Sequence, residues 1–408
     1  MTSLVVYNCI NSLQNSHKPI IIFATPDEAE AVLNACKENK IKVSAFCDNE
    51  ARKADTLFCG LKIIHTSSLK KKFPDAKIII AHHNINDCVR QITEIGYSEI
   101  YSSLQLIENY QLNKYKHIIP QSYMEAKISV SKASHSLYFD NNKTFLRSLD
   151  IVITTKCSMS CESCANLMQF YSSAQNTDEK IVEALEILEN NVDYIGEYRI
   201  IGGEPLMNRN WDEITLNIAS KKERNIFIYT NGTIAPKEDK LKKIEGKNIN
   251  FYITDYGKLS KNIANLEESL KRHGIGYQRE LAHHWVDCSN IRKHNRNIPR
   301  LKQVFKECCA KKLFTLLNGK LFTCPFIANA LNLKAIPDNK ADYVDLFSDS
   351  DSLKNKIKKL VKMDLFFPAC DFCDGRPIDP TTALEYAGKG FIKAGIQANE
   401  TLNYKEYK

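Results

Sequence analysis

The sequence contains no run of eighteen apolar residues, and its first residues, MTSLVVYNCINSLQNSHK, lack a basic segment followed by a long apolar stretch. The first absence argues against a membrane-spanning helix, and the second argues against a secretory signal. No repeat or low-complexity tract interrupts the chain. We therefore expect a soluble, cytoplasmic protein with no membrane partner.

A strong excess of one charge is also lacking. The 56 basic and 48 acidic residues leave a formal net charge of +8, and the short basic clusters, such as residues 354–362, are spread along the chain. Such clusters typically form solvated helix faces, so no nucleic-acid partner is expected. With 408 residues and 43% apolar content, the chain is long enough for two or three domains with ordinary cores.

The glycine fingerprint of dinucleotide-binding domains is missing from a region that otherwise has the right rhythm. Residues 19–102 alternate short apolar strands with helical stretches, which is typical of a small parallel α/β domain. The loop after the first strand reads FATPDEAEAV, so bulky and acidic residues at 25–28 occupy the approach of a pyrophosphate. Catalytic use of a dinucleotide is not expected. Asp48, which ends the second strand, suits a ribose hydroxyl, and a solvated strand-end carboxylate is the alternative interpretation.

A second α/β run follows a change of pattern. Residues 105–144 are polar and contain many Tyr and Ser residues, which predicts a linker with some helix. Four later segments are predicted strands: FLRSLDIVITT, DYIGEYRIIGGEP, RNIFIYTNGT and NINFYITDYG.

Cysteine is plentiful. Fourteen cysteines in a chain without a secretory signal are not expected to form disulfides, because the cytosol keeps thiols reduced. Some lie singly among apolar residues and are interpreted as small buried hydrophobes: Cys9, Cys36, Cys47, Cys59 and Cys88. The other nine lie between positions 157 and 373.

Three of these cysteines share one loop. The stretch TTKCSMSCESCANL places Cys157, Cys161 and Cys164 directly after the apolar run 149–153. A structural zinc site normally has four ligands, and no fourth Cys or His follows within twenty residues of Cys164. Three thiolates suit an iron-sulfur cluster that leaves one iron open to an external ligand.

This loop, placed after a predicted first barrel strand, resembles the signature loop of the radical SAM superfamily. The resemblance implies that Cys157, Cys161 and Cys164 hold a 4Fe-4S cluster and that S-adenosylmethionine (SAM) chelates the fourth iron. The reduced cluster then cleaves SAM to a 5′-deoxyadenosyl radical, which abstracts a substrate hydrogen. The residue before the third cysteine is usually aromatic in the family. Here it is Ser163, which weakens packing over the adenine but still allows a backbone contact with SAM.

The segment IIGGEPLM matches the GGE motif of the family. By that match Gly202, Gly203 and Glu204 meet the SAM amino group, because glycines at the end of a strand let the backbone approach a ligand. A turn between a strand and a helix is the alternative.

Two later strand ends, YTNGT and ITDYG, are similar to family segments that carry ribose or substrate contacts. They contribute Thr230, Asn231 and Asp255 as cofactor-binding candidates.

A second set of cysteines lies in the last third of the chain. Cys309 and Cys324 flank a predicted hairpin with its turn at Asn318 and Gly319, and the segment PACDFCDG adds a C-x2-C turn. Four thiolates are expected to converge, and zinc remains a rival for this set taken alone. The members are Cys309, Cys324, Cys370 and Cys373.

This set resembles the auxiliary-cluster domain of the SPASM and twitch groups, whose C-x9-15-G-x4-C signature is present. No cysteine follows Cys373, so the shorter twitch form with one fully thiolate-ligated 4Fe-4S cluster fits better. Spacing does not decide between Cys308 and Cys309 as the ligand. Cys288 is interpreted as a bystander.

These resemblances set the expected architecture of an α/β protein. Residues 1–112 form a Rossmann-like domain, 113–144 a linker, 145–290 a partial (β/α)6 radical SAM barrel, and 291–408 a twitch/SPASM-like auxiliary-cluster domain. The Rossmann-like domain resembles a degenerate module found at the front of some sugar-modifying proteins.

The expected function is that of a radical SAM enzyme with two 4Fe-4S clusters. An auxiliary cluster without an open iron favours electron transfer, so the enzyme is expected to oxidise a small carbohydrate or nucleotide-linked sugar, with a flavodoxin- or ferredoxin-type reductant. The alternatives are a peptide-modifying maturase of the SPASM type and a zinc-stabilised binding protein without catalytic activity.

Overall fold

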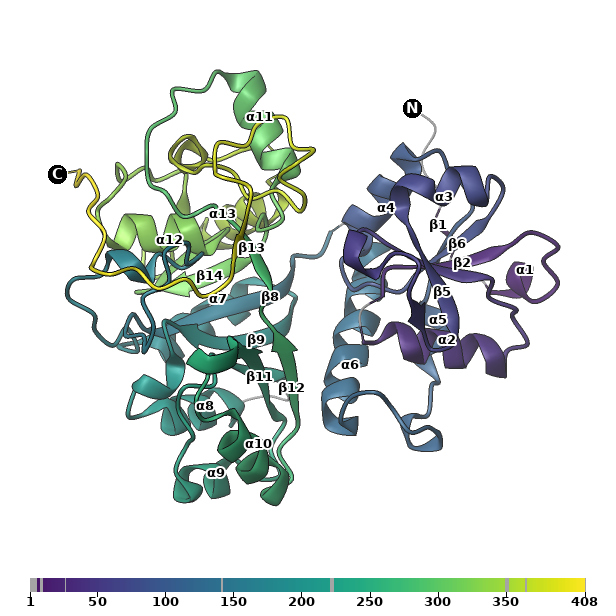
Figure 1. The fold of residues 1–408 in the computed structure, drawn as a ribbon, viewed down its shortest axis with the longest axis horizontal. Coiled ribbons are helices and arrows are strands. Elements are labelled where there is room, and N and C mark those ends of the chain that lie inside the picture. The colour runs from purple at the N-terminus through teal and green to yellow at the C-terminus, as the bar shows by residue number, and fades with distance from the viewer. Residues whose placement is uncertain are drawn as a thin grey trace. The chain divides into compact units, whose positions relative to one another are not determined.

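The computed structural model describes residues 6–7, 10–25, 27–140, 142–220, 224–348, 352–363 and 365–407. Cys9 and Pro26 therefore lie outside the described residues. The chain divides into two compact units, Met1–Lys143 and Thr144–Lys408 (Figure 1). Among the described residues, no helix has the length and apolar character needed to cross a membrane.

The first unit is built on a mostly parallel sheet of seven strands in the order β1-β7-β6-β2-β3-β5-β4. Its central strands are buried along their whole length, which is typical of a parallel sheet covered on both faces. The strands are β1 (Val6–Tyr7), β2 (Ile20–Phe23), β3 (Ala45–Asp48), β4 (Leu57–Phe58), β5 (Leu61–His65), β6 (Lys77–Ile80) and β7 (Ile100–Ser102). The helices are α1 (Asn11–Gln14), α2 (Ala29–Glu38), α3 (Thr66–Lys72), α4 (Ile85–Glu94), α5 (Leu104–Glu108) and α6 (Gln121–Tyr138).

Asp48 has partners within this unit. Its carboxylate accepts hydrogen bonds from the backbone N–H of Thr25 at 2.9 Å and from the Thr25 hydroxyl, and it lies 3.5 Å from Lys53 Nζ. Burial acts to raise the pKa of Asp48, but the Thr25 hydroxyl and the Lys53 charge outweigh it and hold this pKa below its usual range. The expected solvated carboxylate is therefore a largely buried one that joins the ends of β2 and β3.

Most of the expected linker lies inside the first unit. Helix α6 packs against α4 and α5, and it buries one side that includes Tyr123, Met124 and Ile128. Small polar residues of the same helix, such as Ser134, are also buried, and these hide its amphipathic pattern in the sequence. The physical boundary between the units therefore falls at Lys143, after the helix.

The second unit is built on an eight-stranded sheet in the order β12-β11-β10-β9-β8-β14-β15-β16. All neighbouring strands from β12 to β14 are parallel, and β15 and β16 continue the sheet in antiparallel fashion. The strands are β8 (Phe145–Thr154), β9 (Tyr194–Gly202), β10 (Ile226–Thr230), β11 (Ile249–Asp255), β12 (Tyr277–Leu281), β14 (Phe314–Leu317), β15 (Lys320–Phe322) and β16 (Tyr343–Asp345). A separate pair joins β13 (His284–Val286) to β17 (Phe391–Lys393).

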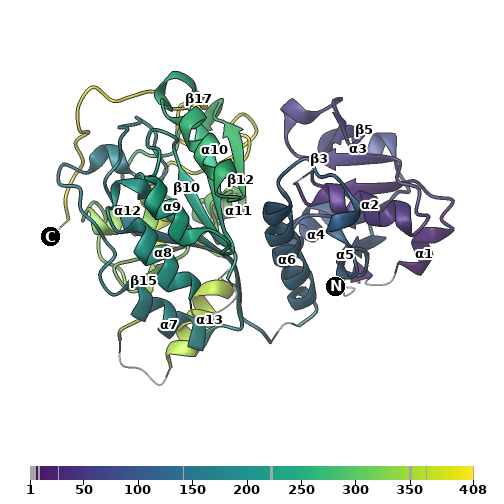
Figure 2. The same cartoon turned by 90° about the horizontal axis from the view of Figure 1, so that it is seen from below.

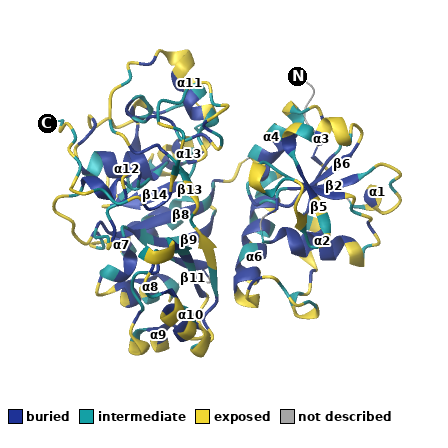
Figure 3. Cartoon of the chain, in the orientation of Figure 1, coloured by how far each residue is buried: buried dark blue, intermediate teal, exposed yellow. Residues whose placement is uncertain are grey.

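Helices cover one face of this sheet (Figure 2). The first four are neighbours in chain order along the parallel strands. They are α7 (Ile181–Asn191), α8 (Trp211–Ala219), α9 (Glu238–Ile244) and α10 (Ile263–Arg272), and the later ones are α11 (Ile298–Glu307), α12 (Pro325–Asn332) and α13 (Leu353–Lys362). The main apolar core lies between these helices and the sheet, and the strands are the most completely buried elements in Figure 3.

The expected boundary at residue 290 does not separate two bodies. Strand β14 pairs with β8 through the partners Phe314–Leu149 and Leu316–Ile151, and both strands contribute to the same core. The hairpin predicted around Asn318 and Gly319 is confirmed as β14 and β15. Residues 291–408 therefore extend the sheet of residues 145–290 within one compact unit.

Candidate functional site

The loop with three cysteines begins where β8 ends, against the end of β9. The backbone N–H of Gly203 donates to the Thr154 carbonyl at 3.1 Å, and the N–H of Glu204 donates to the Lys156 carbonyl at 2.8 Å. The two strand ends are thus fastened directly to each other.

The glycines of the GGE segment are required by this close approach. A Cβ atom at Gly202 would come closer than 3.0 Å to the Thr154 carbonyl, and one at Gly203 would lie 2.7 Å from the Cβ of Cys157. Such distances are not tolerated, so only glycine fits at both positions. The glycines therefore set the path of the cysteine loop.

Glu204 is fully buried and holds neighbouring segments together. Its carboxylate accepts hydrogen bonds from the N–H of Leu206 at 3.1 Å, the hydroxyl of Thr230 at 2.9 Å and the N–H of Asn231 at 2.7 Å. Burial raises the pKa of Glu204 to about 7, and the three donors act in the opposite direction. The carboxylate therefore joins the GGE segment to the end of β10. A contact between Glu204 and SAM stays a prediction.

Asn231 lies beside the first cysteine. Its amide nitrogen is 3.8 Å from Cys157 Sγ and 3.0 Å from Ser158 Oγ, and its carbonyl oxygen accepts from the N–H and hydroxyl of Thr233. Asn231 is partly exposed, so it combines a contact with the loop and an accessible polar surface.

The end of β11 carries Asp255, a cofactor-binding candidate from the sequence. Asp255 is bound to Arg279 through hydrogen bonds of 2.9 and 2.6 Å and accepts from the N–H of Gly257. The next residue, Tyr256, faces the cysteine loop and packs edge-on against Trp285. Burial raises the pKa of Tyr256, and the nearby thiols of the loop add to this shift.

Ser163 is tied to a distant segment. Its hydroxyl donates to the buried carboxylate of Asp287 at 2.6 Å, and the other oxygen of Asp287 accepts from the N–H of Lys389. A polar network therefore stands at the position where the family usually has an aromatic residue. Asp287 was missed in the sequence because it lies 124 residues from Ser163 and no motif surrounds it.

All three thiols of the loop are close to N–H donors. The Cys157 thiol meets the backbone N–H of Met159, and the Cys164 thiol meets three backbone N–H groups at residues 166–168. The amide of Gln397 donates to Cys161 Sγ at 3.2 Å. Burial raises the pKa of Cys161 to about 11, and this hydrogen bond opposes the rise. Such donors stabilise sulfur anions, so the loop fits a group that binds thiolates.

The second set of cysteines converges with one change from the expected membership. One small apolar pocket is lined by Cys308, Cys324, Cys370 and Cys373. Cys309 does not line this pocket and is exposed. The backbone leaves α11 in an extended conformation at Cys308, so consecutive side chains point in opposite directions. The pocket therefore gathers Cys308 in place of Cys309. The role of these cysteines as ligands of a cluster stays a prediction.

The second set also has N–H donors. Cys324 precedes α12, and the first N–H groups of this helix, at Phe326 and Ile327, face its thiol. The N–H of Phe367 donates to Cys370 Sγ at 3.5 Å, and that of Gly375 donates to Cys373 Sγ at 3.4 Å. Thiolates are favoured at helix N-termini and near such donors.

The C-x2-C turn is held from outside by one arginine. Arg296 Nη1 donates to the carbonyls of Cys370 and Cys373 at 3.2 and 2.8 Å, and its backbone N–H donates to Asp371. Burial lowers the pKa of Arg296. Cys288 is buried close to Cys373 but does not line the pocket.

No group of three or more His, Cys, Asp or Glu side chains within the described ranges has the arrangement to hold a single metal ion. An iron-sulfur cluster has different requirements from a single metal ion, because its thiolates bind different irons and lie farther apart.

The face of the sheet opposite the helices is polar. The register sets Asp150 beside Arg199 and Tyr229 beside Tyr252, and these four side chains alternate with the apolar ones that face the helices. Arg199 binds Glu197 at 2.6 Å and lies over the Tyr229 ring, which stacks on Tyr252 at 4.7 Å. Burial raises the pKa of Asp150 to about 6. This face offers charged and hydroxyl groups inside the unit.

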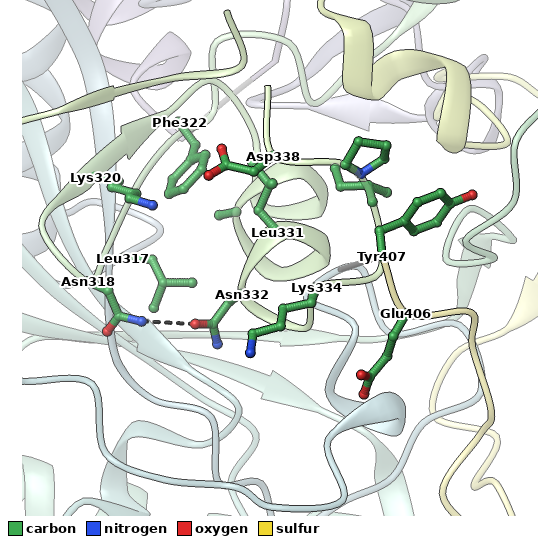
Figure 4. A pocket seen from close by; sticks show the side chains of 13 residues that line it. Leu317, Asn318, Lys320, Phe322, Leu331, Asn332, Lys334, Asp338, Glu406 and Tyr407 are labelled. Atoms are coloured by element: carbon green, nitrogen blue, oxygen red, sulfur yellow. Dashed lines mark hydrogen bonds between the residues drawn. The ribbon is translucent and has the colours of Figure 1, made fainter. Parts of the chain in front are cut away.

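A separate, larger pocket has no cysteine in its lining (Figure 4). Hairpin β14–β15 and α12 form its walls, and Glu406 and Tyr407 close one side. Its labelled side chains combine Lys320 and Lys334 with Asp338, and Asn318 is hydrogen-bonded to Asn332 across it. None of its lining residues was a candidate in the sequence.

Comparison with family models identifies one region of the second unit. Residues 151–258 match the model of the radical SAM superfamily, and this range contains the cysteine loop and the GGE segment. The chain carries a radical SAM domain. The superfamily that this model describes uses SAM and a 4Fe-4S cluster. Residues 16–101 of the first unit match a model described as C2185-like, N-terminal.

Curated relatives are similar to this chain over part of its length only. A probable GTP 3′,8-cyclase of Methanocella arvoryzae is 33% identical over 24% of this chain and 31% of its own length. A GTP 3′,8-cyclase of Synechocystis is 30% identical over 22% of this chain and 27% of its own length. The chain thus matches less than a third of each of these relatives.

Two solved structures show a distant likeness to this chain. One is BtrN in complex with AdoMet and 2-DOIA, with 17% identity, a TM-score of 0.36, and coverage of 60% of this chain and 97% of that one. The other is Streptococcus suis SuiB bound to the precursor peptide SuiA, with 13% identity, a TM-score of 0.27, and coverage of 70% and 88%.

Proposed function

We propose that the protein is a radical SAM oxidoreductase that holds two 4Fe-4S clusters and oxidises a hydroxylated small molecule, either a carbohydrate or a nucleotide-linked sugar. The observation that carries this proposal is the presence of two groups of cysteines, one of three and one of four, within one unit that contains a radical SAM domain.

In this proposal Cys157, Cys161 and Cys164 hold the first cluster, and the rim formed by Ser163, Gly202, Gly203 and Asn231 surrounds SAM. When bound, this cluster supplies the electron that cleaves SAM to a 5′-deoxyadenosyl radical. Thr230 and Glu204 support the rim from within, because the Thr230 hydroxyl donates to the buried carboxylate of Glu204.

The second group suits a cluster in which all four irons have protein ligands. Cys308, Cys324, Cys370 and Cys373 leave no position for substrate, which favours acceptance of an electron over substrate binding. Oxidation of an alcohol needs such an acceptor, because the substrate radical must release one electron and one proton.

The polar face of the sheet supports a hydroxylated substrate. Asp150, Arg199 and Tyr252 offer groups that can form hydrogen bonds with the hydroxyls of a substrate. An apolar substrate would leave these groups without partners. The raised pKa of Asp150, about 6, makes this carboxyl group a candidate for proton exchange near neutral pH.

We propose that the first unit is a Rossmann-like domain that does not bind a dinucleotide. In this sheet β3 and β5 lie on one side of β2, and β6 and β7 lie on the other side. The strand order therefore reverses between β2 and β6, which is where ligands bind in Rossmann-like sheets. Since Thr25 and Lys53 engage Asp48 at the end of β3, a ribose contact there is not part of the proposal. A cytoplasmic setting with a flavodoxin- or ferredoxin-type reductant completes it.

The test is an anaerobic reconstitution followed by iron and sulfide analysis and by assay of 5′-deoxyadenosine with SAM and a reductant. We expect about eight irons per chain and SAM cleavage in the parent protein. Cys161→Ala should lose about four irons and all SAM cleavage, whereas Cys36→Ala, which changes a buried cysteine of the first unit, should retain both. Stoichiometric zinc without iron would contradict the proposal and favour a zinc-stabilised binding protein.

A further inference from the structure

A segment near the end of the chain lies directly on the loop with three cysteines. Residues 396–398 run antiparallel to residues 160–162, with Gln397 opposite Cys161. The N–H of Glu162 donates to the Ile396 carbonyl at 2.8 Å, and the N–H of Ala398 donates to the Ser160 carbonyl at 2.6 Å. The loop therefore gains a short strand-like partner from more than two hundred residues away.

The side chain of Gln397 adds three hydrogen bonds to this pairing. Its Oε1 accepts from the backbone N–H of Ser160 at 2.8 Å, and its Nε2 donates to Cys161 Sγ at 3.2 Å and to the Gly395 carbonyl at 2.8 Å. If the amide were turned over, its oxygen would face a sulfur and a carbonyl oxygen, and its NH2 would face an N–H group. Only the observed orientation satisfies all partners, so the donor must point at the cysteine sulfur.

The segment is fixed on both sides of Gln397. Before it, β17 pairs with β13, and Gly395 has a φ of +77° and lies against Tyr256, where a Cβ would be 2.8 Å from the ring. After it, the N–H of Leu402 donates to the Gln169 carbonyl at 2.9 Å. Gln397 is therefore held against the loop by the surrounding fold.

We propose that Gln397 is a positioning residue of the first cluster, which fixes the loop at Cys161 and raises the reduction potential of the cluster through its N–H···S hydrogen bond. This inference rests on the proposed function of the three cysteines. The physical reason is electrostatic: a donor aimed at a ligand sulfur stabilises the reduced state, which carries one more negative charge.

The experiment compares Gln397→Met and Gln397→Glu with the parent in anaerobic redox titrations followed by electron paramagnetic resonance. The first-cluster signal is identified as the one that changes when SAM is added. Gln397→Met removes the donor without adding charge, and Gln397→Glu removes the donor but keeps an acceptor for Ser160. Asn399→Asp serves as the control, because it adds the same charge at an exposed position two residues away.

We expect both Gln397 variants to lower the ratio of reduced to oxidised first cluster about threefold to tenfold at a fixed potential, where tenfold corresponds to 59 mV for one electron. Asn399→Asp should match the parent. Parent-like potentials in both Gln397 variants would overturn the inference, as would a shift in Gln397→Glu that Asn399→Asp reproduces and Gln397→Met lacks.

A second measurement addresses the loop itself. Hydrogen exchange of the peptide 158–163 should be faster in Gln397→Met than in the parent, whatever the iron content of the variant, because the N–H of Ser160 loses its acceptor. Unchanged exchange would overturn the positioning role. A parent protein without any SAM-responsive signal would overturn the proposed function and this inference together, whereas an unshifted variant overturns the inference alone.

Discussion

Cys308 and Cys309 are adjacent in the chain but have different surroundings. Cys308 lines the pocket with three other thiols, and Cys309 is exposed. We predict that Cys308→Ser lowers the iron content from about eight to about four per chain and that Cys309→Ser leaves it unchanged. Metal analysis after anaerobic reconstitution measures this difference.

The matched pair also controls for damage to the fold. Both substitutions replace sulfur by oxygen at the end of α11, so a general effect on folding would appear in circular dichroism of both variants. Iron loss in Cys309→Ser with retention in Cys308→Ser would show that the extended backbone at Cys308 is oriented the other way.

Asp342 gives a pH-dependent prediction. Its carboxyl is almost fully buried and accepts from the N–H of Ala369 at 3.0 Å, and burial raises its pKa to about 6. Because the folded-state pKa is above the unfolded value, the charged form destabilises the fold as pH rises from about 4 to about 6. We predict that Asp342→Asn gains about 2 kcal/mol in free energy of unfolding relative to the parent between pH 4 and pH 7.5.

Urea unfolding at the two pH values measures this gain. Asp338→Asn is the control, since Tyr343 and Lys340 outweigh burial and lower the pKa of Asp338. A carboxyl with a lowered pKa keeps its stabilising charge throughout this pH range and loses it only at lower pH. Asp338→Asn should therefore show nearly the same pH dependence as the parent between pH 4 and pH 7.5. Equal pH dependence in Asp342→Asn and Asp338→Asn would refute the assignment of the shift to burial at Asp342.

The residues that sequence reasoning found and missed differ in one physical respect. The three loop cysteines and the GGE segment belong to short motifs whose spacing is visible along the chain. Asp287 and Gln397 act on Ser163 and Cys161 from 124 and 236 residues away, and such pairs exist only once the chain has folded. The structure pairs the Asp255 carboxylate with Arg279, and a contact between Asp255 and a ligand stays a prediction.

At the level of elements, the junction of β8 and β9 leaves no space for an added side chain at Gly203. A side chain at Gly203 would collide with Cys157 and the Lys156 carbonyl, both at the start of the cysteine loop. We predict that Gly203→Ala loses the iron of the first group and all SAM cleavage but retains about four irons in the second group. Iron analysis with a 5′-deoxyadenosine assay distinguishes this from global unfolding.

Gly246→Ala is the control for the glycine prediction. Gly246 has a φ of +69°, and a Cβ atom at this position would have no heavy atom within 4 Å, so the variant reports the cost of backbone strain without a collision. Iron content equal to the parent in Gly203→Ala would mean that the loop can move away from β9 without losing its function.

Some elements followed from their local sequence and others did not. The hairpin of β14 and β15 has an Asn-Gly turn with both residues at positive φ, which the sequence pattern identifies directly. The pairing of β14 with β8 joins residues more than 160 positions apart, and no local pattern encodes such a register. Helix α6 was expected only as part of a linker because its buried serines break the apolar stripe.

At the scale of the whole molecule, the two compact units predict where the chain can be divided. A chain of residues 144–408 should fold and bind about eight irons, because it contains both groups of cysteines and one continuous core. A chain of residues 144–290 should not unfold cooperatively in urea, since β8 loses its neighbour β14 and core residues such as Leu149 become exposed.

Circular dichroism and fluorescence of Trp211, which is buried in this core, follow both unfolding transitions. The chain of residues 1–143 provides the comparison for the first unit. A cooperative transition in the shorter chain, with stability close to that of residues 144–408, would show that the core does not depend on β14.

The parallel pairing of β14 with β8 has a consequence for timing. The three-cysteine loop follows β8, and Cys308 and Cys324 flank the hairpin of β14 and β15 in the same sheet. The pairing of β8 with β14 thus connects the two groups of cysteines within one compact unit. An electron carrier that works by swinging a domain is limited by the rate of that motion. Under the proposed function, electron transfer between the two groups of cysteines requires no domain motion. We therefore expect the binding and release of small molecules to limit the turnover rate.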